Sequence, residues 1–107
     1  MNTASLRSPL VRRAIEAINK EHFDEFMELF APDATVVDES SYVGYDAIAA
    51  WARRETFGAH VRFHLARERN EKGTILEGNV VSIGGYSGPA TFTFTIQGDR
   101  IERLVIE

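Results

Sequence analysis

The chain has 107 residues, enough for one domain with a single hydrophobic core and too few for two. Its 44% hydrophobic and 26% charged residues are typical of a globular protein. The 12 Lys and Arg against 16 Asp and Glu, with no long basic run, argue against nucleic acid as a partner, and the absence of cysteine excludes disulfides and thiolate metal sites. No apolar run could span a membrane and Met1 to Pro9 lacks the apolar core of a signal peptide, so we expect a cytoplasmic protein.

Two helices are predicted at the start of the chain. Ser8 and Pro9 are typical of an N-cap and a first helical position. The helix that follows has one apolar face made of Val11, Ala14, Ile15 and Ile18. Polar residues 19–22 interrupt this period, and a shorter helix from Phe23 to Phe30 follows, which Pro32 should end.

A short strand, residues 34–38, carries a carboxylate where an apolar side chain is expected. Alternation along the strand puts Asp38 on the same face as Ala34 and Val36. If that face is the inner one, Asp38 points into apolar surroundings. A carboxylate there normally has a hydrogen-bond or ionic partner or takes part in function. Asp38 is then either a general base or the acceptor for loop amides such as those of Ser40 and Ser41.

A polar loop, residues 39–44, leads to a third helix that runs from Tyr45 to about Phe57, with Asp46 as a candidate cap and Gly58 as its end. Its apolar face contains Trp51, which fits core packing and a pocket wall equally well. Tyr42, in the loop, would place a ring and a hydroxyl at the mouth of such a pocket.

The rest of the chain is predicted to form strands joined by turns. They lie near residues 60–65, 74–83, 90–97 and 101–106. The clearest one has Phe92 and Phe94 on its inner face, and the threonines Thr91, Thr93 and Thr95 on its outer face, where they form either a solvated surface or a dimer contact. His60 and His64 resemble a metal pair, but in a strand they would lie about 13 Å apart, so we expect no metal site. Helices followed by a meander of strands predict an α+β domain.

The segment Leu29 to Asp38 (LFAPDATVVD), the helix entry from Gly44 to Trp51 and the meander together resemble the nuclear-transport-factor-2-like (NTF2-like) superfamily. The SnoaL-like and ketosteroid-isomerase-like branch is the most similar, and the resemblance runs from about Val11 to Ile106. It implies one domain over residues 1–107 with a cone-shaped α+β fold, in which a curved, mostly antiparallel sheet wraps around the N-terminal helices. It also implies an apolar pocket and a homodimer.

The resemblance also nominates site residues. In ketosteroid isomerases the base is an Asp at the end of the strand that follows a DATV segment, which corresponds to Asp38 here. The oxyanion tyrosine of that family corresponds to Ala14, and its second acid to Thr91 or Phe92, so a true ketosteroid isomerase is not expected. The pocket of the cone would be lined by Ala14, Ile18, Phe26, Phe30, Val36, Tyr42, Trp51, Phe92 and Phe94.

These observations predict a protein that binds a small, mostly apolar molecule without a cofactor. If it is an enzyme, we expect an isomerase, cyclase, lyase or hydrolase that works by acid–base chemistry, with Asp38 as the base and Tyr42 or a water as the donor. The alternative is a non-catalytic ligand-binding or dimerisation module with the same fold.

Overall fold

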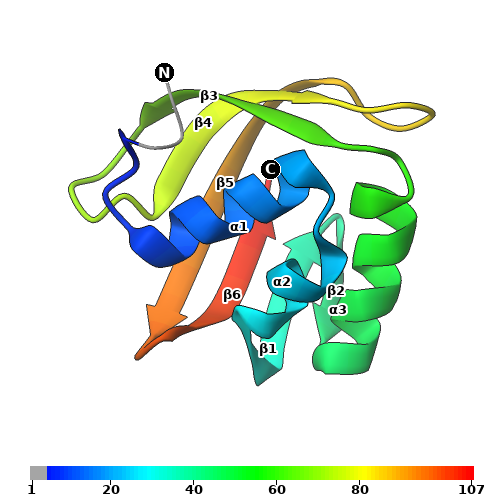
Figure 1. Ribbon diagram of the computed structural model, residues 1–107, viewed down its shortest axis with the longest axis horizontal. Helices are drawn as coiled ribbons and strands as arrows, with labels where there is room; N and C mark the ends of the chain where they lie inside the picture. The colour runs from blue at the N-terminus through cyan, green and yellow to red at the C-terminus, as the bar shows by residue number, and fades with distance from the viewer. Residues whose placement is uncertain (1–4) are drawn as a thin grey trace.

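The computed structural model describes residues 5–107 (Figure 1). Helix α1 (Pro9–Lys20) begins as predicted, because the Ser8 side chain accepts a hydrogen bond from the Val11 amide. Glu21, with φ of 58°, ends it, and helix α2 (Phe23–Glu28) follows. The prediction that Met1 to Pro9 is not a signal peptide includes residues 1–4, which lie outside the described part of the chain. Within residues 5–107, no helix has the length and apolar character needed to cross a membrane.

The strand that carries Asp38 is longer than predicted. Strand β1 (Phe30–Asp38) already begins at Phe30, so Pro32 lies inside the strand and does not end the helix. The register of β1 against β6 is irregular between Phe30 and Thr35, and a proline is tolerated at such an irregularity because no ladder donor is needed there. The predicted loop after Asp38 is also wrong in part, since residues Ser40–Val43 form an edge strand, β2, that pairs with β1. Its exposed residues give no alternation that would reveal a strand.

The third helix changes its hydrogen-bonding period half-way. Helix α3 (Tyr45–Trp51) begins after Gly44, with Asp46 in its first turn and not at the cap. It continues as a π-helix, η2 (Ala52–Phe57), in which each turn is one residue wider than in an α-helix. Gly58 ends it with φ of −64°, so it is not a left-handed cap. The reason for glycine is space, since a Cβ there would lie 2.2 Å from the carbonyl oxygen of Arg53.

One curved sheet contains all six strands in the order β2-β1-β6-β5-β4-β3. Strands β3 (Arg62–Glu68), β4 (Ile75–Val81), β5 (Gly88–Gln97) and β6 (Arg100–Ile106) form an antiparallel meander, while β1 and β6 are parallel. The sheet curls around α1 and α2, which confirms the expected α+β cone (Figure 1). Ala90, Phe92 and Phe94 face inward on β5 as predicted. Strict alternation along residues 101–106 would put Ile101 and Leu104 on opposite faces of β6. A register shift opposite Thr95 and Ile96 turns both of them inward.

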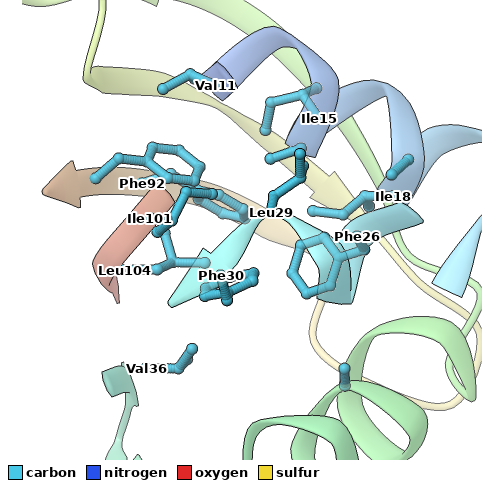
Figure 2. Packing of buried hydrophobic residues seen from close by; sticks show 14 of the residues in the cluster. Val11, Ile15, Ile18, Phe26, Leu29, Phe30, Val36, Phe92, Ile101 and Leu104 are labelled. Carbon is cyan, nitrogen blue, oxygen red and sulfur yellow. The ribbon is translucent and has the colours of Figure 1, made fainter. Parts of the chain in front are cut away.

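The core lies between the inner face of the sheet and the helices. Side chains of α1, α2 and the strands point toward one another and fill the space between the helices and the sheet (Figure 2). The residues labelled there are buried: Val11, Ile15, Ile18, Phe26, Leu29, Phe30, Val36, Phe92, Ile101 and Leu104. A cavity beside this core lies where β1 and β6 finish, at the end of the sheet that we call the wide end of the cone.

Candidate functional site

The topology of the sheet brings several strand ends to one place. Because β1 and β6 are parallel, their C-terminal ends, with Asp38 and Glu107, lie at the same end of the sheet. Strand β5 runs the opposite way and begins there, with Phe92 opposite Ile106, and Val80 near the end of β4 pairs with Gly88. Residues far apart in sequence therefore meet at the wide end of the cone.

A cavity of about 270 Å³ opens at this end. That is about nine times the volume that one water occupies in the liquid, and it lies at the small end of the range for ligand pockets. Most of its wall is apolar, formed by Ile18, Trp51, Val61, Val80, Ala90, Phe92 and Ile106. Its polar side chains are Asp38, Glu39, Glu55, Thr56, Ser82, Tyr86 and Glu107. A site of this size fits a molecule of one or two rings.

Asp38 lies on the cavity wall, half-buried, and is held by a tryptophan. The indole Nε1–H of Trp51 donates a hydrogen bond of 3.0 Å to Asp38 Oδ2. Trp51 is 2% exposed and also packs against Phe26, with 6.5 Å between ring centroids, so it serves both the core and the cavity. Among the described residues, the partner of Asp38 is therefore this indole and not the amides of Ser40 and Ser41. Its Oδ1 has no hydrogen bond to a described residue and is available to a molecule in the cavity.

Thr56 is a cavity residue that the sequence did not reveal. It is 6% exposed, it lines the cavity, and its hydroxyl makes no hydrogen bond with another described residue. At the 100° per residue of an α-helix, Thr56 would lie about 140° away from Trp51. In the π-helical turn, residues five apart come close to alignment, so both side chains reach the cavity. No pattern in the sequence predicts this wider turn.

Two other hydroxyls of the cavity are already engaged. The Tyr86 hydroxyl donates to the Pro89 carbonyl at 2.7 Å, and the Ser82 hydroxyl donates to the Tyr86 carbonyl at 2.6 Å. Both bonds lie within the turn between β4 and β5, so they shape the rim of the cavity. Thr56 is consequently the hydroxyl that remains for a ligand.

Of the predicted pocket residues, Ile18, Trp51 and Phe92 line the cavity together with Asp38. The others do not reach it, which corrects the prediction: Ala14, Phe26, Phe30, Val36, Phe94 and Tyr42. The first five are buried in the core between the helices and the sheet. Ala14, for example, lies one helical turn before Ile18, and Phe94 lies two residues after Phe92. Tyr42 instead packs its ring on Trp51 at 6.2 Å, and its hydroxyl accepts a hydrogen bond of 3.4 Å from Arg54.

The histidines lie outside the cavity. His64 is exposed on β3, whereas His60 precedes that strand and has φ of 52°. His60 Nδ1 lies 2.5 Å from Glu21 Oε1, and Arg62 donates to the other oxygen of the same carboxylate at 3.0 Å. The contact with His60 and then that with Arg62 hold the pKa of Glu21 below its ordinary value. Within residues 5–107, no three His, Asp or Glu side chains are grouped so that they could hold a metal ion.

Comparisons with known proteins agree with this architecture. A family model described as a SnoaL-like domain matches residues 11–104, whereas a search of curated proteins gave no match. A solved structure from Sinorhizobium meliloti, described as a candidate polyketide cyclase, has a TM-score of 0.82 and 27% identity, with 100% of both chains covered. A protein from Sphaerobacter thermophilus has a TM-score of 0.76 and 27% identity over 92% of this chain and 91% of its own.

An NTF2-like protein from Cytophaga hutchinsonii has a TM-score of 0.76 over 100% of this chain and 89% of its own. At 15% identity that likeness shows the fold alone. The family model, in contrast, spans most of the sequence and includes the strand of Asp38 and the helix of Trp51. The chain therefore belongs to the SnoaL-like family and has its NTF2-like fold.

Proposed function

We propose that this protein binds a small, mostly apolar organic molecule in the cavity and removes a proton from it with Asp38, without a cofactor. The observation that carries the proposal is the geometry of Asp38, whose Oδ2 is held by the Trp51 indole while Oδ1 is left for the ligand. The similarity to a candidate polyketide cyclase at 27% identity supports an isomerase-type or cyclase-type reaction. Family membership supports binding of a small molecule.

The chemistry would begin with transfer of a proton from a carbon next to a carbonyl group to Oδ1 of Asp38. The electron pair of the broken C–H bond moves toward the carbonyl oxygen, to which the Thr56 hydroxyl can donate a hydrogen bond. Asp38 then returns the proton to another carbon of the substrate, or the carbanion attacks a second carbonyl group and Asp38 gives its proton to the alkoxide that forms. A positioned base of this kind contributes about 10²- to 10⁴-fold. At the positions of the family's oxyanion donors, Ala14 cannot donate a hydrogen bond and neither Thr91 nor Phe92 is a carboxylic acid, so we expect a modest catalyst.

Hydrogen–deuterium exchange tests the proposal without knowledge of the natural substrate. β-Tetralone, a two-ring ketone with acidic C–H bonds, is incubated with the protein in D2O, and loss of the α-proton signal is followed by NMR. We expect the wild type to exchange this proton at least about 10²-fold faster than Asp38→Asn. Thr56→Val, which keeps the shape of the side chain, should lose a smaller factor.

Fluorescence of Trp51, the single tryptophan of the chain, reports binding in the same samples. Binding with equal exchange in the wild type and Asp38→Asn would reject Asp38 as the base and leave the non-catalytic ligand-binding module. If β-tetralone does not change the fluorescence, this ketone is not a ligand, and a lack of exchange then says nothing about Asp38.

We also propose that the protein is a homodimer in the cytoplasm. The outer sheet face and the exposed apolar side chains of Val81 and Ile83 support a contact between two copies. Sedimentation equilibrium over a range of protein concentrations would show twice the monomer mass if this is correct, and the monomer mass throughout if it is not.

A further inference from the structure

The charges around the cavity are all of one sign. Four carboxylates line it, those of Asp38, Glu39, Glu55 and Glu107, and the described lining residues include no Lys, Arg or His. In the 12-to-16 ratio of basic to acidic residues of the whole chain, four acidic residues would be matched by three basic ones. The cavity therefore departs from the composition of the chain, and its potential is negative.

The four carboxylates lie at two different depths in the cavity. Asp38 is half-buried on the wall, whereas Glu39, Glu55 and Glu107 are exposed and form the mouth. Among the described residues, one mouth carboxylate has a cationic partner, since Arg54 Nε lies 3.4 Å from Glu55 Oε1. Both side chains of that pair are at least half exposed, so water screens the contact and the mouth keeps most of its negative charge.

The interior offers a second, independent feature. The hydroxyl of Thr56 is in a residue that is 94% buried, it lacks a hydrogen-bond partner among the described residues, and it can accept an N–H bond from a ligand. The indole of Trp51 also lines the cavity and gives an apolar, aromatic surface for the body of a ligand. A buried, unused acceptor and an aromatic wall behind a negative mouth favour a ligand with an apolar body and a positively charged nitrogen.

We propose that the ligand is a small organic amine that binds in its protonated form. This inference rests on the proposed function and specifies its substrate class. The apolar body enters the cavity, and the ammonium group lies between the carboxylates of the mouth and the Thr56 hydroxyl. An anionic ligand would be repelled by four carboxylates, and a neutral ligand would leave their mutual repulsion unrelieved.

The same charge would assist the proposed proton transfer. When Asp38 takes a proton, its negative charge passes to the substrate, so the total charge of the site does not change. An ammonium group on the substrate reduces the net negative charge of the site by one unit and stabilises the developing carbanion from within the same molecule. This compensates for the oxyanion tyrosine and the second acid that this chain lacks.

Three probes with one benzyl body and different charges test the inference. They are 2-phenylethylamine, which is an ammonium ion at neutral pH, the neutral 2-phenylethanol and the anionic phenylacetate. An exposed charge pair contributes about 1.5- to 5-fold in affinity, so four carboxylates together should favour the ammonium probe over the alcohol by about 10- to 100-fold. Phenylacetate should bind most weakly. Trp51 fluorescence gives the three dissociation constants.

Salt and matched variants separate charge from shape. Raising NaCl from about 20 to about 300 mM should weaken the ammonium probe and leave the alcohol unchanged, because salt screens only the charged ligand. The double variant Glu39→Gln/Glu55→Gln should weaken the ammonium probe about 3- to 10-fold without affecting the alcohol. Glu71→Gln, which removes one carboxylate charge in the turn between β3 and β4 and away from the cavity, is the control and should change neither affinity.

The outcomes distinguish this inference from the proposed function. Equal affinity for the ammonium probe and the alcohol, or an ammonium affinity that salt and the double variant do not change, would overturn the amine assignment, while binding of organic molecules in the cavity would stand. If none of the three probes changes the fluorescence of Trp51, both the amine assignment and the cavity as a binding site are wrong.

Discussion

The hydrogen bond between Trp51 and Asp38 can be measured directly with a double-mutant cycle. Trp51→Phe removes the indole donor and keeps an aromatic ring, whereas Asp38→Ala removes the acceptor. Hydrogen bonds to charged groups contribute about 1.5–3 kcal/mol. The donor is 2% exposed but the carboxylate is only half-buried, so we expect a coupling free energy near the lower end, about 1.5 kcal/mol.

Each variant alone would give a misleading number. Trp51→Phe also leaves space in the core beside Phe26, and Asp38→Ala also removes a charge from the negative cavity. The cycle of wild type, two single variants and the double variant cancels these separate effects and leaves the pairwise term. Urea unfolding followed by far-UV circular dichroism is the suitable assay, because Trp51→Phe removes the only tryptophan.

A coupling below about 0.5 kcal/mol would refute the reasoning, since independent sites already deviate from additivity by that much. The carboxylate would then not be held by the indole in solution, and the availability of Oδ1 would lose its basis. With a coupling near the expected value, Trp51→Phe should also slow the exchange of β-tetralone more than it weakens binding, because a base that loses its orientation loses rate first. Because this variant has no tryptophan, binding is followed by the NMR signals of the ketone.

Three further predictions concern stability. Gly78→Ala should destabilise the protein by about 1–3 kcal/mol, because a Cβ there would meet a carbonyl oxygen of β3 at 2.3 Å, whereas Asn79→Ala on the same strand should change little; equal melting temperatures would contradict this. Ser8→Ala should cost about 1 kcal/mol through loss of the α1 cap, seen as a lower urea midpoint, and an unchanged midpoint would reject the cap. The contact with His60 holds the pKa of Glu21 below its ordinary 4.5. The ionised Glu21 therefore stabilises the folded protein above pH 4.5, and this stabilisation is lost as the pH falls through the pKa of the folded state. The melting-temperature difference between wild type and Glu21→Gln should therefore shrink as the pH is lowered from about 5.5 to below about 4.5, and a constant difference would exclude the ion pair as its source.

The sequence by itself predicted the features that depend on local patterns. Ser8 and Pro9 marked the start of α1, and strict alternation placed Phe92 and Phe94 on the inner face of β5. The same alternation put Asp38 in phase with the buried Val36, so the candidate base could be found before any coordinates. These inferences succeed because helical and strand periods are set by backbone geometry within a few residues.

The inferences that failed concern departures from a regular period. Pro32 was expected to end a helix but lies in a strand, because an irregular register removes the need for its missing amide. The edge strand β2 has no alternation, because residues on both faces of it are exposed and neither face selects apolar side chains. The shift in β6 likewise depends on its pairing with β5, which no single segment encodes.

The site as a whole was decided by tertiary structure. The parallel pairing of β1 with β6 puts Asp38 and Glu107 at the same end of the sheet, and the wider π-helical turn brings Thr56 to the same cavity as Trp51. Sequence alone therefore supplied the carboxylate and its apolar surroundings. The negative mouth and the buried hydroxyl exist only because distant strand ends and one irregular helix meet, and such long-range contacts leave no periodic signal in the chain.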